Sequence, residues 1–274
     1  MSKMAKNLDK IGLRSIAKNY DLFFIDIWGV IHNGIKLNKN SIKVLEELDN
    51  LKKDYVLLTN APRPNITVSK FLQNMGLDIK KSNKVFTSGE ATLNYLKKNL
   101  NDLKFYHIGP SKDFDLFDIF KKNKTENIDE ANFLLCTGFF EQHENNLGYY
   151  KTLLNKKILI KMICTNPDLI IVRGSEREYC AGTIAQIFEQ LGGKVEYFGK
   201  PYPLVYEQST NIKNKKILCI GDNLNTDIRG ANIKNFDSVL ISSGIHYKEI
   251  NEDTNKLFQK YNSYANYTQS ELKW

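Results

Sequence analysis

The sequence has no long hydrophobic run. None of its apolar segments approaches the ~20 residues that a helix needs to span a membrane. The opening stretch, residues 1–7, leads into no apolar signal core. These absences argue against a membrane-spanning helix and a secretory leader. We therefore expect a cytoplasmic protein with no membrane partner.

Cysteine is scarce and shows no paired spacing. Of the four cysteines, three lie in or at the end of apolar, strand-like stretches, where cysteine behaves as a small hydrophobic residue. No group of histidines and cysteines has the spacing of a zinc site. We expect buried, reduced thiols, as is usual inside a cell. The four are Cys136, Cys164, Cys180 and Cys219.

The positive charge of the chain is not concentrated anywhere. The 274 residues carry a formal net charge of +8, but the lysines are scattered along the whole sequence. There is no arginine-rich block and no stripe of alternating basic and aromatic residues. A Lys/Asn-biased globular protein explains this pattern better than a nucleic-acid binder does, so we expect no nucleic-acid partner. An RNA-binding role would reveal itself as a steep salt dependence of binding.

Strands and helices alternate along the chain. This alternation predicts an α/β fold with parallel sheets and right-handed crossovers. The helix after the first strand has Asn38 or Asn40 as its cap, and the polar stretch after Gly244 gives no prediction. Strands are predicted at residues 22–27, 55–60, 85–86, 104–108, 131–137, 158–164, 194–198, 215–221 and 238–241, and helices at 68–75, 90–100, 179–191 and up to 231.

So many strands suit two α/β units better than one sheet. We expect one unit to be inserted into the other. The predicted core domain spans residues 1–88 and 197–274, and the predicted inserted domain spans residues 89–196.

Acidic residues close two of the apolar strands. Asp26 ends the strand that begins at Leu22, and Asp222 follows the strand 215–221, with Asp227 shortly after it. The carboxyl ends of parallel strands meet at one edge of a sheet, so these carboxylates can converge and hold a cation.

A hydroxyl and an ammonium group lie between these acids in the sequence. Thr59 and Asn60 end the next strand, and Lys200 stands between Gly199 and Pro201. A carboxylate nucleophile, a hydroxyl, a cationic side chain and metal-binding carboxylates together indicate phosphoryl transfer.

These segments resemble the four motifs of the haloacid dehalogenase (HAD) superfamily. Their spacing is similar to that of the class II (IIA) branch, whose nucleotide and sugar-phosphate phosphatases carry a large α/β cap between the second and third motifs. The resemblance implies a Rossmann-like HAD core with an inserted cap that sets specificity. The segments are Asp26-Ile27-Trp28-Gly29-Val30, Thr59-Asn60, Lys200 and Gly221-Asp222-Asn223-Leu224-Asn225-Thr226-Asp227.

The resemblance also implies a magnesium ion. Asp26 would attack phosphorus and form an aspartyl-phosphate, and the metal would offset the repulsion between this carboxylate and the phosphate. Asp26, Asp222 and the backbone oxygen of Trp28 would bind Mg²⁺, which prefers oxygen ligands. Asp227 would orient metal-bound water or Lys200; alternatively, it only complements the N-terminal dipole of a helix.

Phosphate contacts follow from the same comparison. Thr59 would donate its hydroxyl hydrogen bond to the phosphoryl oxygens, with help from the amide of Asn60. Lys200 would neutralise the charge that develops on them. Gly29 would leave room for backbone amides to approach the phosphate.

Trp28 departs from the family pattern. Phosphatases of this superfamily usually have aspartate two residues after the nucleophile, where it protonates the leaving oxygen and activates water. An indole can do neither, and general acid–base catalysis is typically worth ~10²–10⁴-fold. We interpret the site as tuned away from ordinary alkyl phosphates, although Trp28 could also simply fill the core. His32, in the turn beyond it, is a candidate acid or base or else a polar loop residue.

The predicted cap offers further substrate contacts. Asn166 and Asp168 lie at its edge, and Arg173 and Arg177 lie in the charged stretch 173–178. The arginines would hold a second anionic group of the substrate, although a solvated surface loop is the better explanation of them. Caps of this kind often take part in dimers in related proteins, so a homodimer is a further expectation.

Together these features predict a Mg²⁺-dependent phosphatase of small phosphorylated metabolites. Two alternatives stay open. A phosphotransferase would pass the phosphoryl group to an acceptor other than water, and the missing water-activating aspartate favours it. A protein that binds phosphate compounds with little turnover is the other, and Trp28 also suits it.

Overall fold

The computed structural model describes residues 5–144, 146–173, 176–250 and 254–274. Its contacts divide the chain into two compact units. The core unit comprises Met1–Thr59, Ile66–Phe86 and Lys200–Trp274, and the inserted unit comprises Asn60–Asn65 and Thr87–Gly199. The sequence-based boundaries put all of residues 1–88 and 197–274 in the core.

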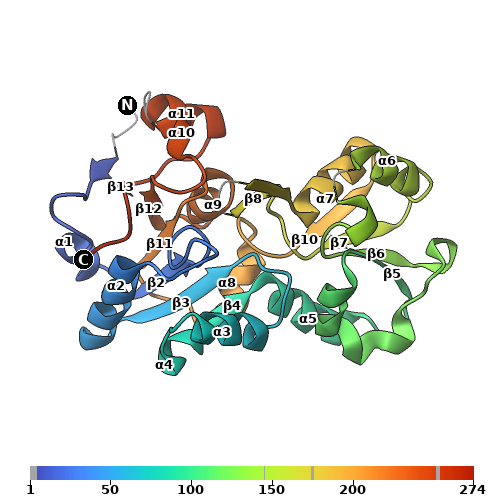
Figure 1. Cartoon of the computed structure of the whole chain (residues 1–274), viewed down its shortest axis with the longest axis horizontal. Helices are drawn as coiled ribbons and strands as arrows, with labels where there is room; N and C mark the ends of the chain where they lie inside the picture. The colour runs from blue at the N-terminus through green and yellow to red at the C-terminus, as the bar shows by residue number, and fades with distance from the viewer. Residues whose placement is uncertain (1–4, 145, 174–175, 251–253) are drawn as a thin grey trace. The chain divides into compact units, whose positions relative to one another are not determined.

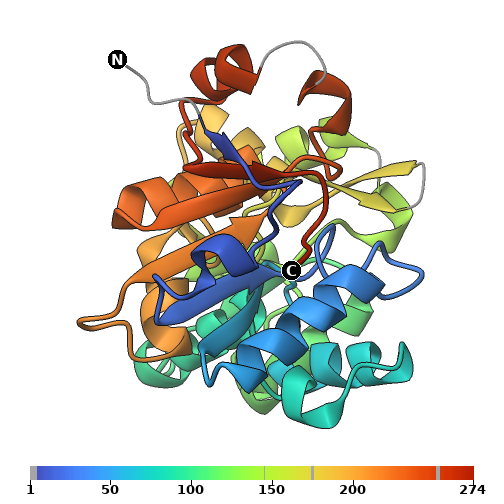
Figure 2. The same cartoon turned by 90° about the vertical axis from the view of Figure 1, so that its left-hand side faces the viewer.

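The core unit is built on one sheet of strand order β1-β13-β12-β11-β2-β3-β4. Strands β1 and β13, β13 and β12, β12 and β11, β11 and β2, and β2 and β3 pair in parallel, which confirms the predicted fold class. Figure 1 shows the central strands in this order, and Figure 2 shows β1 in blue beside β13 in red. The strands are β1 Lys6–Asn7, β2 Leu22–Asp26, β3 Asp54–Thr59, β4 Val85–Thr87, β11 Ile217–Gly221, β12 Asp237–Ile241 and β13 Tyr267–Gln269.

Short helices connect these strands. Helix α2 begins after Asn38, whose side chain accepts a hydrogen bond from the Asn40 backbone N–H, so Asn38 is the cap. Its buried face includes Val44, Leu45 and Leu48. The helices of this unit are α1 Arg14–Ala17, α2 Lys39–Asn50, α3 Asn65–Asn74, α4 Ile79–Ser82, α8 Pro203–Ser209, α9 Arg229–Lys234, α10 Tyr247–Ile250 and α11 Thr254–Tyr261, with a π-helical turn at Leu224–Ile228.

The inserted unit has its own parallel sheet, of strand order β10-β7-β6-β5. Helix α7 contributes Ile184 and Phe188 to a core that also contains Leu134 and Met162 from the sheet. The elements are β5 Phe105–Ile108, β6 Phe133–Cys136, β7 Lys161–Cys164, β10 Lys194–Tyr197, α5 Ser88–Asn99, α6 Leu147–Asn155 and α7 Ala181–Gln190, with 3₁₀ turns at Ser111–Asn123, Ile128–Glu130 and Glu141–His143.

One stretch differs from the sequence-based expectation, and another has structure where the sequence gave no prediction. The charged stretch 173–178, expected as a loop, includes part of an antiparallel pair formed by β8 (Ile170–Arg173) and β9 (Glu176–Tyr179). Cross-strand pairing creates this element, and polar composition does not reveal it. The tail after Gly244, which gave no prediction, contains α10, α11 and the sheet strand β13.

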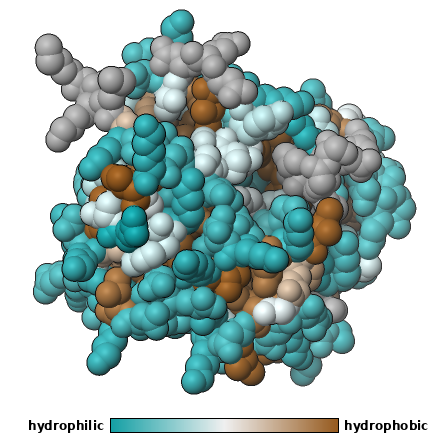
Figure 3. Space-filling view, turned by 60° about the vertical axis from the view of Figure 1, so that its left-hand side comes forward, coloured by the Kyte–Doolittle hydropathy of each residue, from teal (hydrophilic) through white to brown (hydrophobic). Residues whose placement is uncertain are grey.

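The cysteines match their predicted character, and the face shown in Figure 3 is mostly hydrophilic. Hydrophilic residues cover most of the face shown in Figure 3, with hydrophobic residues in small groups between them. All four cysteines are buried and form no disulfide. Among the described residues, no helix is both long enough and apolar enough to cross a bilayer.

Candidate active site

The register of the core sheet brings the predicted acidic and hydroxyl residues to one edge. Asp26 ends β2, is 8% exposed, and lies opposite Leu58 of β3, so Thr59 is one residue beyond it. On the other side, Ile25 lies opposite Ile220, and Asp222 follows two residues later. Parallel pairing therefore puts all three chain segments at the same carboxyl edge.

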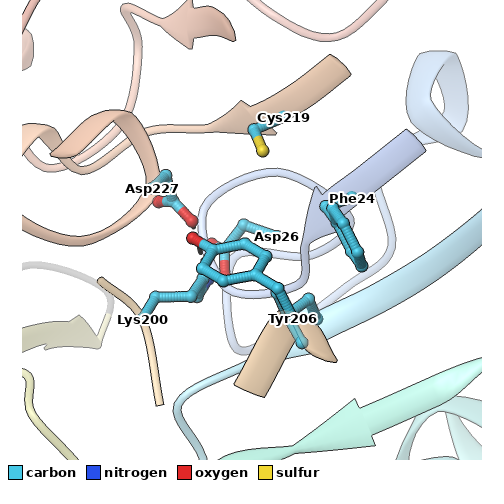
Figure 4. A pocket seen from close by; sticks show the side chains of 7 residues that line it. Phe24, Asp26, Lys200, Tyr206, Cys219 and Asp227 are labelled. Atoms are coloured by element: carbon cyan, nitrogen blue, oxygen red, sulfur yellow. Dashed lines mark hydrogen bonds and ion pairs between the residues drawn. The ribbon is translucent and has the colours of Figure 1, made fainter. Parts of the chain in front are cut away.

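Lys200 joins two of the carboxylates. Its Nζ donates to Asp26 Oδ1 and, at 2.7 Å, to Asp227 Oδ1. Figure 4 shows these three side chains pointing toward one another. Burial alone lowers the pKa of Lys200, but Asp227 and Asp26 outweigh this effect and raise it, so the side chain stays an ammonium ion.

The three carboxylates form a compact oxygen cluster. Each of Asp26, Asp222 and Asp227 offers an oxygen atom, and these atoms all lie within 4.8 Å of one another. Burial raises the pKa of Asp26; Lys200 opposes this shift, while Asp227 and Asp222 add to it. One ammonium does not balance three carboxylates, so the donor set fits a divalent cation such as Mg²⁺.

Glycines leave space for two of these carboxylates. A Cβ added at Gly29, where φ is +86°, would overlap the carboxylate of Asp222. A Cβ at Gly221 would overlap Asp227 in the same way. The sequence suggested a phosphate-facing role for Gly29, and the structure adds that its missing side chain makes room for Asp222.

Residues after β12 contact the loop that carries Asp222. The sequence analysis gave no prediction for these residues. The Ile245 backbone N–H donates to Asp222 Oδ2 at 2.9 Å, and His246 Nε2 accepts from the Leu224 backbone N–H at 3.1 Å. They lie in the tail whose polar composition gave no prediction. Their role becomes visible only when β12 is placed beside β11.

Two of the carboxylates, Asp26 and Asp227, line a small pocket. Tyr206 is buried in its wall, and its hydroxyl has no hydrogen-bond partner among the described residues. Burial raises the pKa of this phenol, so it stays neutral. The pocket is lined by Phe24, Asp26, Leu58, Lys200, Tyr206, Cys219 and Asp227 (Figure 4).

Trp28 lies two residues after the end of β2 and belongs to a group of packed aromatic rings. Its ring packs edge-on against His32, with centroids 5.0 Å apart, and His32 packs against Phe71 at 5.5 Å. His32 Nδ1 accepts from the Gly34 backbone N–H at 2.8 Å, and burial lowers the His32 pKa to about 4. His32 is therefore a neutral imidazole near pH 7, which makes it a poor general acid.

Comparison with known proteins identifies the family. A model of haloacid dehalogenase-like hydrolases matches residues 23–120, and a second, HAD-hydrolase-like model matches residues 197–262. The two matched segments contain Asp26, Thr59, Lys200, Asp222 and Asp227. The chain belongs to the haloacid dehalogenase-like hydrolases.

Curated HAD-like relatives match over most of their length. The acid sugar phosphatase of Staphylococcus haemolyticus is 25% identical, with 86% of this chain and 90% of that protein covered. The dihydroxyacetone phosphatase of Corynebacterium glutamicum is 24% identical, with 81% of each protein covered. Among solved structures, a haloacid dehalogenase-like hydrolase from Brucella suis is similar, with a TM-score of 0.77, 29% identity, and 86% and 90% of the two chains covered.

The remaining predicted site residues of this HAD-like hydrolase lie in the inserted unit. Asn60 Nδ2 donates to Asp168 Oδ1 at 3.1 Å, and the Asp168 backbone N–H donates to Asn166 Oδ1 at 2.9 Å. These three residues form one hydrogen-bonded group. Arg177 is exposed on β9, and the side chain of Arg173 lies outside the described part of the structure.

Proposed function

We propose that this HAD-like hydrolase is a Mg²⁺-dependent phosphatase of small phosphorylated metabolites. The observation that carries the proposal is the convergence of Asp26, Asp222 and Asp227 with Lys200 at one edge of the sheet. Burying three carboxylates with one ammonium leaves an excess of negative charge, which is costly without a bound cation. The names of the two curated relatives described above, both phosphatases, support the same reaction.

Asp26 supplies the nucleophile in this proposal. Its carboxylate oxygen attacks phosphorus, the bond from phosphorus to the leaving oxygen breaks, that oxygen takes up a proton from water, and an aspartyl-phosphate forms. Water then attacks the same phosphorus, the bond to Asp26 breaks, and inorganic phosphate leaves. A bound Mg²⁺ would reduce the repulsion between the two anions and polarise the phosphoryl oxygens.

Lys200, Thr59 and Asp227 support that reaction. The Lys200 ammonium neutralises charge on the phosphoryl oxygens, and the Thr59 hydroxyl donates to them. Asp227 holds Lys200 through one oxygen and accepts from the Asn223 backbone N–H through the other, at 3.2 Å. Asp227 is therefore best suited to orienting Lys200, while Asp26, Asp222 and the backbone oxygen of Trp28 would hold the metal.

Trp28 shapes the substrate preference. Because an indole cannot protonate a leaving oxygen, substrates with good leaving groups should react fastest. The names of the relatives point instead to small sugar phosphates, which are alkyl phosphates with poor leaving groups, so we propose that these are hydrolysed but more slowly than aryl phosphates. The same names also favour water as the acceptor over a phosphotransferase reaction.

Paired aspartate variants test the proposal. We expect Asp26→Asn to lower Mg²⁺-dependent hydrolysis of sugar phosphates and aryl phosphates by at least ~10³-fold. Asp54→Asn is the control, because Asp54 is an exposed residue at the far end of the neighbouring strand. EDTA should abolish the activity and Mg²⁺ should restore it. Equal activity in both variants would reject the mechanism.

A further inference from the structure

The turn after β12 holds the loop that carries Asp222. We propose that His246 is a positioning residue, which fixes the Asp222 carboxylate in the geometry that a divalent cation needs. The inference rests on the proposed cation site but not on the identity of the substrate. Three sets of contacts carry it, and all of them lie in the core unit.

The first contact is between backbone and carboxylate. The Ile245 N–H donates to Asp222 Oδ2 at 2.9 Å, and a Cβ added at Gly244 would overlap the same carboxylate. The backbone at 244–245 is thus pressed against Asp222 with no side chain between them. A shift of this turn would move the carboxylate directly.

The second contact ties that turn to the loop itself. His246 Nε2 accepts from the Leu224 N–H at 3.1 Å, two residues after Asp222. Since a backbone amide can only donate, Nε2 carries no proton, and the ring proton of the neutral imidazole lies on Nδ1. Nδ1 can therefore donate to Glu249 Oε1, 3.1 Å away.

The third set anchors the histidine from helix α11. Glu249 accepts from Lys260 Nζ at 2.6 Å and from the Tyr261 hydroxyl at 3.1 Å. The Tyr261 ring also packs edge-on against His246, with centroids 4.6 Å apart. Leu224 is fully buried in a cluster with Leu257 and Phe258 of the same helix.

These contacts distinguish a positioning role for His246 from two simpler roles, acid–base catalysis and filling of the core. Both ring nitrogens of His246 are engaged within the protein, so neither faces a substrate as an acid or base. A residue that only filled the core would be apolar, because burying a polar ring without a need for its hydrogen bonds is unfavourable. Residues that orient metal ligands typically contribute 10–100-fold to metal affinity.

Two variants at one position provide the test. His246→Gln keeps an acceptor near the position of Nε2, while His246→Leu removes it at similar volume. Mg²⁺ affinity is measured by calorimetry on the whole protein without substrate, and kcat and KM are measured at saturating Mg²⁺. We expect His246→Leu to weaken Mg²⁺ binding by ~10-fold or more, His246→Gln to retain most of the affinity, and kcat to recover at high Mg²⁺.

Glu249→Gln provides the test if the His246→Leu variant does not fold. It keeps the shape of the anchor but removes its charge, and we expect an intermediate loss of Mg²⁺ affinity. Unchanged Mg²⁺ affinity in folded His246→Leu, or in Glu249→Gln if the leucine variant does not fold, would overturn the positioning role alone. If the unsubstituted protein binds no Mg²⁺, both this inference and the proposed cation site fail.

Discussion

At the scale of single residues, the site depends on close approaches that only certain side chains permit. Asp222 is approached from two sides by backbone, at Gly29 and Gly244, and a Cβ at either position would overlap it. Lys200 is the ammonium between Asp26 and Asp227. The close approach of the backbone to Asp222 is possible because glycine has no side chain at these two positions.

Two glycine variants separate backbone strain from displacement of Asp222. Gly29 and Gly76 both have positive φ, so alanine at either position should cost about 1–2 kcal/mol of unfolding free energy. Only Gly29→Ala meets the Asp222 carboxylate, whereas nothing lies within 4 Å of a Cβ at Gly76. We expect a drop in Mg²⁺ affinity of ~10-fold or more for Gly29→Ala only, measured by calorimetry. Equal losses in both variants would mean that strain alone explains the effect.

His107 predicts a pH dependence of stability. Burial, helped by Lys124, lowers its pKa from 6.5 to about 4, and its Nε2 lies 2.8 Å from Thr137 Oγ1. The unfolded chain therefore takes up this proton first, so the stabilising contribution is complete above pH 6.5 and is lost as the pH falls toward 4. The expected loss approaches ~3 kcal/mol.

Urea unfolding of the wild type and His107→Asn between pH 6.5 and 4 measures this contribution. The other buried histidines titrate in both proteins, so the difference in slope isolates His107. Identical slopes would show that His107 does not titrate in this way.

At the scale of elements, the sequence predicts those helices and strands whose formation depends on residues close together in the chain. The apolar strands that lead into Asp26, Thr59 and Asp222 are predicted from the sequence, because a buried parallel strand is a continuous apolar run. The pair β8–β9 could not be predicted. The segment Glu176-Arg177-Glu178 has no strand-like pattern of its own and forms a strand because it pairs with β8. The support of Asp222 by Ile245 could not be predicted for a similar reason, because this contact depends on the pairing of β11 with β12.

The cap of helix α2 gives a test at this scale. The sequence allowed Asn38 or Asn40, and the structure assigns the cap to Asn38. Asn38→Ala should lower the unfolding free energy by about 1 kcal/mol. Asn40→Ala, which loses only an exposed bond from Asn40 Nδ2 to Glu271, should change it by less than ~0.5 kcal/mol. Denaturant unfolding measures both, and the reverse order would move the cap to Asn40.

At the scale of the whole molecule, the predicted site residues are distributed over the two units. The core unit holds the proposed nucleophile, cation site and Lys200, and the inserted unit holds the group Asn60, Asn166 and Asp168. The chain passes between the units directly after Thr59 and directly before Lys200. Three expectations stay predictions. They are substrate contacts by the inserted unit, a homodimer and a cytoplasmic location.

The central claim is that Asp26 carries the phosphoryl group during turnover. The most direct measurement is acid quenching of the enzyme during steady-state hydrolysis, followed by mass spectrometry of the peptide that contains Asp26. We predict one phosphoryl group on Asp26, formed only with Mg²⁺ and absent from Asp26→Asn. Steady hydrolysis with no phosphoryl group on Asp26, or full activity in Asp26→Asn, would contradict the account.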